Sequence, residues 1–151
     1  MHGTVHDEGA AMMGGLSSNA GLFASANDLA KLFQMYLNGG TYGGKRYISQ
    51  EAIKEFTKCQ FPENDNRRGL GFDKPLLEYH PVNSSVAKDA SPLSYGHSGY
   101  TGTFFWIDPK HELIYIFLSN RVYPTRDNRK IYELNIRPTI HQIIYDSFKK
   151  R

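Results

Sequence analysis

Apolar side chains are concentrated in two short runs in the last third of the chain, with polar residues between them. The runs cover residues 104–107 and 113–118 and are rich in aromatic and β-branched residues. Asp108 and Pro109 lie between them and favour a turn. Two such runs joined by four or five residues predict a β-hairpin over about residues 103–119. Because the second run is almost continuously apolar, we expect its strand to be covered on both faces.

Elsewhere, apolar residues recur every three or four positions, which predicts amphipathic helices. These helices span about residues 26–38, 50–58 and 138–149. Ser25 and Ser49 are suitable N-caps for the first two helices, and Gly39 ends the first. Pro138 suits the first position of the last helix, because that position needs no backbone N–H.

The remaining segments have weaker patterns. Residues 1–24 are predicted to be loop-rich, residues 41–48 to form a short hairpin, and residues 69–72 to form a short strand. Long irregular stretches are expected at residues 73–94 and 122–135. The order of helices, then strands, then a helix predicts an α+β fold with a mainly antiparallel sheet.

Composition narrows the class of protein. The 151 residues are 40% apolar and 22% charged, as expected for one globular domain with a core. The net charge of +3 comes with no recognisable nucleic-acid-binding motif, so we expect no nucleic-acid partner. No apolar run is long enough for a membrane helix, and the first residues lack the apolar stretch of a secretory signal. The single cysteine, Cys59, excludes an internal disulfide.

The candidate chemistry lies just before the hairpin, in the sequence Gly-His-Ser-Gly-Tyr-Thr-Gly at residues 96–102. Three glycines in seven residues favour an edge strand, at about residues 94–99, whose backbone is closely approached by a ligand or another chain segment. His97 and Ser98 place an imidazole and a hydroxyl in the same strand. A strand with bare backbone and these two groups is typical of one wall of an active site.

Several segments together resemble a known family. They are residues 19–23, the helix that begins near Asp28, residues 69–72, residues 96–102, the 104–118 hairpin, residues 119–124 and the closing helix. In this order they resemble the C-terminal part of class C β-lactamase-like serine hydrolases, a group that includes penicillin-binding proteins, D-alanyl-D-alanine peptidases and esterases. The match looks closest to the module that often follows a family-3 glycoside hydrolase in Bacteroidetes-type bacteria, most specifically at residues 69–75 and 117–129.

The resemblance implies roles for individual residues. His97-Ser98-Gly99 resembles the third motif of the family, with His97 in the position of its lysine as a proton relay and Ser98 contacting the substrate carboxylate or carbonyl. The backbone N–H of Tyr100 would be one of two oxyanion donors. The remaining residues implied to bind substrate are Gly99, Arg126, Arg129 and Asn19. A solvated charge is an equally good interpretation of the two arginines. No metal or organic cofactor is implied.

The first two motifs of the family, Ser-x-x-Lys and Tyr-x-Asn, are expected to precede this segment. Chance matches occur at Ser85–Lys88, Ser147–Lys150 and Tyr36–Asn38, none in the order or context of the family. The chain therefore offers oxyanion and binding groups without a credible nucleophile. We predict that residues 1–151 form a single C-terminal segment of a β-lactamase-like domain that is inactive alone.

Two expectations about partners follow. Without the missing N-terminal part, one face of the hairpin should lie bare, so we expect a complex with that part or a homodimer through the uncovered face. Relatives usually work in the periplasm, so the parent protein is expected to be exported. Two alternatives stay open: a non-catalytic binding module for peptidoglycan-like carboxylate ligands, and a structural α+β domain in which His97 is a core residue.

Overall fold

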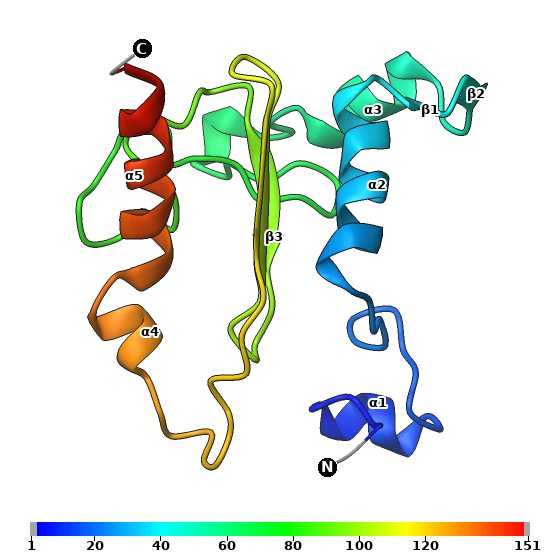
Figure 1. Ribbon diagram of the computed structural model, residues 1–151, viewed down its shortest axis with the longest axis vertical. Helices are drawn as coiled ribbons and strands as arrows, with labels where there is room; N and C mark the ends of the chain where they lie inside the picture. The colour runs from blue at the N-terminus through cyan, green and yellow to red at the C-terminus, as the bar shows by residue number, and fades with distance from the viewer. Residues whose placement is uncertain (1–2, 150–151) are drawn as a thin grey trace.

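The computed structural model describes residues 3–149 and confirms the α+β class, with an antiparallel sheet between helices (Figure 1). The elements are α1 (Glu8–Met12), α2 (Ala26–Leu37), β1 (Thr41–Tyr42), β2 (Lys45–Arg46), α3 (Gln50–Thr57), a 3-10 turn η1 (Pro62–Asn64), β3 (Tyr95–Ser98), β4 (Phe104–Asp108), β5 (Leu113–Phe117), α4 (Lys130–Glu133) and α5 (Ile136–Lys149).

The main sheet has three strands in the order β3-β4-β5, all antiparallel. Tyr95 lies opposite Ile107 in the β3–β4 pair, and Ile107 lies opposite Ile114 in the β4–β5 pair. The β4–β5 hairpin therefore forms where the apolar runs predicted it, and the β3 edge strand forms where the glycines predicted it. The small β1–β2 hairpin also lies in the predicted 41–48 segment.

Successive side chains of a strand point to opposite faces of the sheet, so the core is divided into two layers, one on each face. On one face, Phe104, Trp106 and Tyr115 pack against Ile144 of α5. On the other face, side chains of the three strands pack against α2 and Phe72. The strands contribute Tyr95, Phe105, Ile107, Ile114 and Ile116, and α2 contributes Leu29, Phe33, Tyr36 and Leu37. Figure 1 shows the sheet between α5 and α2.

The expectation of a fully bare sheet face is not met, because α2 packs on the face opposite α5. Phe33 stacks on Phe105 with the ring centroids 4.2 Å apart. Ile114 and Ile116 of the outer strand remain only half-buried on this face. The cover is therefore incomplete toward β5, and the expectation of a partner remains a prediction.

Local signals set the helix boundaries closely but not everywhere. Ser25 and Ser49 cap α2 and α3 through their side-chain oxygens, as predicted. The helix predicted to start at Pro138 begins instead at Ile136, because the Thr139 N–H bonds to the Asn135 carbonyl. Pro138 still lies in the first turn, where a missing N–H leaves no bond unmade.

Three segments differ from the prediction. Residues 69–72 form a turn rather than a strand, and the bridge to β3 is made by Asp73 instead. The loop-rich entry contains the short helix α1, which Asp7 caps by accepting a hydrogen bond from the Ala10 N–H. A further short helix, α4, lies in the stretch expected to be irregular.

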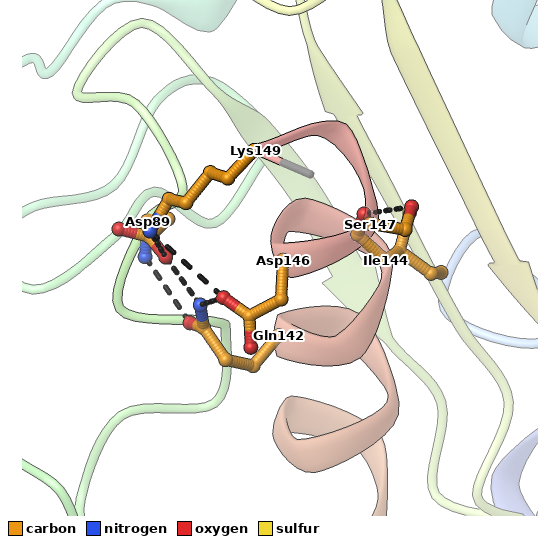
Figure 2. Close-up of polar contacts among 6 residues, drawn as sticks. All are labelled: Asp89, Gln142, Ile144, Asp146, Ser147 and Lys149. Atoms are coloured by element: carbon orange, nitrogen blue, oxygen red, sulfur yellow. Dashed lines mark hydrogen bonds and ion pairs between the residues drawn. The ribbon is translucent and has the colours of Figure 1, made fainter. Parts of the chain in front are cut away.

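The long 73–94 loop is anchored to both β4 and α5. The buried Asp108 carboxylate accepts hydrogen bonds from the Ser91 hydroxyl at 2.6 Å and from the Tyr145 hydroxyl at 2.6 Å. Burial alone would raise the pKa of Asp108, but these hydrogen bonds outweigh it and lower the pKa. At the surface, Asp89 of the same loop binds Gln142 and Lys149 of α5, as Figure 2 shows.

Gly96 is the glycine on which the sheet depends most. A Cβ at this position would overlap the Phe105 carbonyl oxygen and the Trp106 ring of the neighbouring strand. The close approach predicted from the glycines is therefore made here by another strand. We expect Gly96→Ala to destabilise the fold by about 3 kcal/mol or more, because β3 and β4 must separate. Urea unfolding measures this difference.

Gly9→Ala in α1 is the matched control for Gly96→Ala, because its new Cβ meets only the Asp7 side chain. We expect it to change stability by less than about 1 kcal/mol. Equal midpoints for the two variants would contradict the packing argument.

His141 makes stability depend on pH. Its ring is fully buried between Tyr115 and Tyr145, and burial lowers its pKa from 6.5 to about 4. The unfolded chain therefore binds more protons than the folded chain between pH 4 and pH 6.5. We expect the free energy of unfolding to fall by roughly 3 kcal/mol as the pH drops through this window.

Urea unfolding between pH 4 and pH 7 measures this slope. His141→Asn, which keeps an acceptor for the Ala87 N–H that bonds to Nδ1, should flatten the slope although it lowers stability overall. The exposed His80→Asn is the control and should retain the slope. An unchanged slope in His141→Asn would show that other groups cause the pH dependence.

Candidate functional site

The last residue of β3, Ser98, directs its backbone groups away from the rest of the sheet. The Asp73 N–H donates to the Gly96 carbonyl at 2.7 Å, and the Gly96 N–H donates to the Asp73 carbonyl at 3.0 Å. Along an antiparallel strand, alternate residues direct their backbone groups to opposite sides. The N–H and C=O of Ser98 therefore face the same side as those of Gly96, away from β4 and beyond the reach of the Asp73 bridge.

A tight turn follows β3 and carries the predicted oxyanion donor. The Gly99 N–H donates to the Thr103 carbonyl at 2.8 Å, and the Gly102 N–H donates to the Gly99 carbonyl at 3.0 Å. Gly102 has a φ of 100°, which favours glycine, and its position leaves room for Ser119. Within residues 3–149, the N–H groups of Tyr100 and Thr101 donate to no protein acceptor.

His97 and Ser98 do not converge on one point. Neighbouring residues of a strand point to opposite faces, so His97 lies with Phe105 on the α2 face and Ser98 lies with Phe104 on the α5 face. His97 Nδ1 lies 2.9 Å from the Ser98 carbonyl, which assigns the ring proton to Nδ1. The other ring nitrogen, Nε2, is then the one able to accept a proton.

A groove of about 1270 Å³ runs between the N-terminal segment and the end of the sheet. One wall comes from residues 3–7 and 16–24, and the other from the 99–103 turn and residues 118–124. Asn19 lies in the first wall, where its amide donates to Asp7 at 3.3 Å and its oxygen accepts from Ser17. The groove therefore brings Asn19 to the same space as Gly99 and Tyr100. His97 and Ser98 do not line it.

A second, smaller pocket of about 520 Å³ lies on the other side of Tyr100. It is lined by Tyr100, Arg121, Arg126, Asp127, Arg129 and Tyr132. The three guanidinium groups outnumber the one carboxylate, so the pocket favours an anion. Arg126 is exposed and forms an ion pair with Glu8 at 3.2 Å, whereas Arg129 makes no ion pair within residues 3–149. Tyr100 is the residue that the groove and this pocket share.

Three segments match the Ser-x-x-Lys or Tyr-x-Asn motifs by chance. Within residues 3–149, their key side chains either pack or bond as part of the fold or make no bond to the motif lysine. Tyr36 packs edge-on against Phe72 in the core, with the ring centroids 5.7 Å apart. Ser85 lies in an irregular loop and makes no hydrogen bond to Lys88 within the described part of the chain. Ser147 donates to the Ile144 carbonyl of its own helix, as Figure 2 shows, and Lys150 lies outside the described residues.

Across residues 3–149, no cluster of three or more histidine, cysteine or acidic side chains could hold a metal ion. Over the same residues, no helix has the length and hydrophobicity needed to span a membrane. This end of the sheet presents backbone N–H donors, guanidinium groups and the His97 ring. These groups suit the binding of a carboxylate and the stabilisation of a developing oxyanion.

Comparison with known families identifies this arrangement. The family model for β-lactamase matches residues 2–136. The chain belongs to the β-lactamase family. A β-lactamase from Mycobacterium bovis has the same fold, with a TM-score of 0.66 and 22% sequence identity over 85% of this chain and 46% of that one.

Two curated relatives carry a more specific name. A protein of Escherichia coli O157:H7 and one of Salmonella gallinarum are each 40% identical to this chain over 130 residues, and the name of each assigns it provisionally to the D-alanyl-D-alanine carboxypeptidases. The alignment covers 85% of this chain but 29% of each relative. The chain thus spans under a third of the length of these relatives.

The sequence predicts roles for Tyr100, Arg126 and Arg129, which the structure places around one pocket, but it predicts none for Arg121, which lines the same pocket. The structure places the Arg121 guanidinium against the Tyr100 ring, 4.5 Å from its centroid. The one local signal for Arg121 is that it lies shortly after the end of β5. Neither periodicity nor motif spacing distinguishes such a residue from a solvated charge.

Proposed function

We propose that this chain provides the oxyanion and carboxylate-binding wall of a serine hydrolase that transfers acyl groups, with D-alanyl peptides as the first candidate substrates and β-lactams or esters as further ones. The observation that carries the proposal is the Tyr100 N–H, which has no protein acceptor among residues 3–149 and lies at the junction of a groove and an arginine-lined pocket. A peptide in the groove would direct its carbonyl to this N–H and its carboxylate to Arg126 and Arg129. The names of the curated relatives support the D-alanyl class.

The nucleophile is supplied by a further part of the hydrolase, in which we place the Ser-x-x-Lys and Tyr-x-Asn motifs. Exposed apolar side chains of the N-terminal segment and of the loop after β5 favour such a partner: Met12, Met13, Leu16, Leu22, Phe23 and Tyr123 are each more than 60% exposed. A homodimer through the same surface is the alternative. We place the parent protein in the periplasm, where D-alanyl peptides of the cell wall are found.

A chimera tests the proposal. The 130 residues of the Escherichia coli relative that align with this chain are replaced by the corresponding residues of this chain, and hydrolysis of an acylated Lys-D-Ala-D-Ala peptide is measured. We expect the chimera to keep the activity of the relative within about tenfold. The relative with the same region deleted should be inactive. An inactive chimera that folds would overturn the proposal.

The isolated chain should turn over neither this peptide, nitrocefin nor a p-nitrophenyl ester. Robust turnover that disappears in Ser85→Ala would instead make Ser85 the nucleophile. The absence of a serine hydrogen-bonded to a lysine within residues 3–149 keeps one other function open, a non-catalytic module that binds peptidoglycan-like carboxylates. Binding of the peptide by a chimera that never hydrolyses it would favour that module.

A further inference from the structure

Aromatic rings and guanidinium groups alternate in a stack that runs from the site into the core. The Arg121 guanidinium lies 4.5 Å from the Tyr100 ring centroid and 5.3 Å from that of Tyr132. The Arg137 guanidinium lies 5.2 Å from Tyr132 and 5.4 Å from Phe104. We call these five residues the arginine ladder. Each contact lies within the distance over which a cation is attracted to a ring face.

Arg121 binds the turn after β3 and the loop before α4 at the same time. Its backbone N–H donates to the Thr101 carbonyl at 2.9 Å, and its Nε donates to the Tyr100 carbonyl at 2.8 Å. Its Nη1 donates to the carbonyls of Arg126 and Asn128 at 2.8 and 3.0 Å. One side chain thereby fixes the turn that carries the Tyr100 N–H relative to the loop that carries Arg126.

Arg137 lies at the other end of the same turn. Its Nη1 is 3.5 Å from the carbonyl oxygens of both Gly102 and Thr103. Only 6% of the residue is exposed, and no carboxylate lies within ion-pair distance among residues 3–149. The carbonyls of residues 100–103 are thus all turned toward the two arginines or the turn itself, while the N–H groups of Tyr100 and Thr101 are left free.

We infer that Arg121 is a positioning residue for the oxyanion donor, an inference that rests on the proposed function. By holding the Tyr100 carbonyl, it fixes the peptide group that carries the Thr101 N–H. By holding the Thr101 carbonyl, it fixes the peptide group of the Gly102 N–H, which in turn donates to the Gly99 carbonyl in the same peptide group as the Tyr100 N–H. Its charge lies behind the turn and favours negative charge on the N–H side. Because it also holds the Arg126 carbonyl, the oxyanion donor and the carboxylate-binding loop are aligned as one unit.

Amide hydrogen exchange of the 151-residue chain tests the positioning directly. In Arg121→Met, the Gly99 and Gly102 amides should exchange at least tenfold faster, while the amides of β4 should keep their rates. Arg46→Met is the matched control, because Arg46 is exposed and donates to the carbonyls of Gly39 and Ile48 far from the site. Unchanged exchange in the turn, or an equal rise in the turn and in β4, would overturn the inference.

Kinetics of the chimera separate positioning from binding. In Arg121→Met we expect kcat for the D-Ala-D-Ala peptide to fall about 100-fold with KM changed less than threefold, since an oxyanion contact is realised in the transition state. Arg121→Lys, which keeps the charge, should recover part of kcat. A rise in KM at constant kcat would make Arg121 a binding residue and overturn the inference. If the unsubstituted chimera is inactive, the proposed function fails, and hydrogen exchange alone decides the role of Arg121.

Discussion

Tyr100→Pro should lower kcat/KM of the chimera by 10²- to 10³-fold, because it deletes the N–H that we assign to the oxyanion. Removing one oxyanion donor typically has an effect of this size. Proline fits the site without breaking the turn, because it is favoured at the second position of common β-turns and Tyr100 occupies that position between Gly99 and Gly102. No protein acceptor within residues 3–149 loses a hydrogen bond when proline replaces Tyr100.

Tyr100→Ala is the control that isolates the N–H. Both variants remove the ring that stacks on Arg121 and on His6, but only proline removes the N–H. We expect Tyr100→Ala to lose less than about tenfold in kcat/KM, so the ratio between the two variants measures the N–H alone. Thermal unfolding of both variants tests whether the fold is retained. Equal turnover by the two would show that this N–H does not contact the reacting carbonyl.

The effect should fall mainly on kcat. A neutral carbonyl in the bound substrate gains little from the N–H, whereas the oxyanion of the transition state gains much more, so the loss appears in the chemical step. Arg129→Gln, in contrast, should raise KM if the arginine pocket binds the substrate carboxylate. Comparing the two variants therefore separates the oxyanion contact of the Tyr100 N–H from carboxylate binding by the arginine-lined pocket.

Local sequence signals predicted most elements of the fold, because each depends on residues close together in the chain. The apolar runs predicted β4 and β5, and the serines at positions 25 and 49 predicted the starts of α2 and α3. The helix α1 was missed because glycines surround it. Residues 69–72 were wrongly expected to form a strand: Gly69 bonds to Phe72 within the segment and Leu70 bonds to the Phe56 carbonyl of α3, and neither bonds to a neighbouring strand.

The site was predictable only as a list of residue types. Tyr100 was predicted from the third family motif and Arg126 from its place beyond the last strand, but the contact between their segments depends on Arg121, which is 21 residues from Tyr100. The opposite orientations of His97 and Ser98 follow from strand geometry once β3 is known. Contacts such as the arginine ladder join three separate segments, and no single-segment pattern encodes them.

Asp108 shows the same limit in the core. Its place before Pro109 marks a turn, and a turn does follow it, yet its side chain is fully buried. The carboxylate accepts from the Ser91 N–H and hydroxyl, the Tyr145 hydroxyl and the Lys110 N–H. These donors come from the 73–94 loop, from α5 and from the β4–β5 turn. One acceptor therefore holds together three segments that share no periodicity.

Asp108→Ala should destabilise the fold by about 3–5 kcal/mol, the range for removing one partner of a buried charged network. Four donors lose their acceptor, and those of Ser91 and Tyr145 are buried away from water. Because a domain of this size has a total stability of about 5–15 kcal/mol, the variant should be unfolded or close to it at 37 °C. Urea unfolding at 15 °C measures the difference.

Two further variants make the result specific to the network. Asp108→Asn keeps one carboxyl-like oxygen and should lose roughly half as much, whereas the exposed Asp146→Asn should change stability by less than about 0.5 kcal/mol. Tyr145→Phe removes one donor, and its effect should shrink in the Asp108→Ala background because the hydroxyl then has no carboxylate to bind. Additive effects of Asp108→Ala and Tyr145→Phe would mean that the carboxylate and the hydroxyl stabilise the fold separately, and the loop would then be held to α5 mainly by the surface contacts of Asp89.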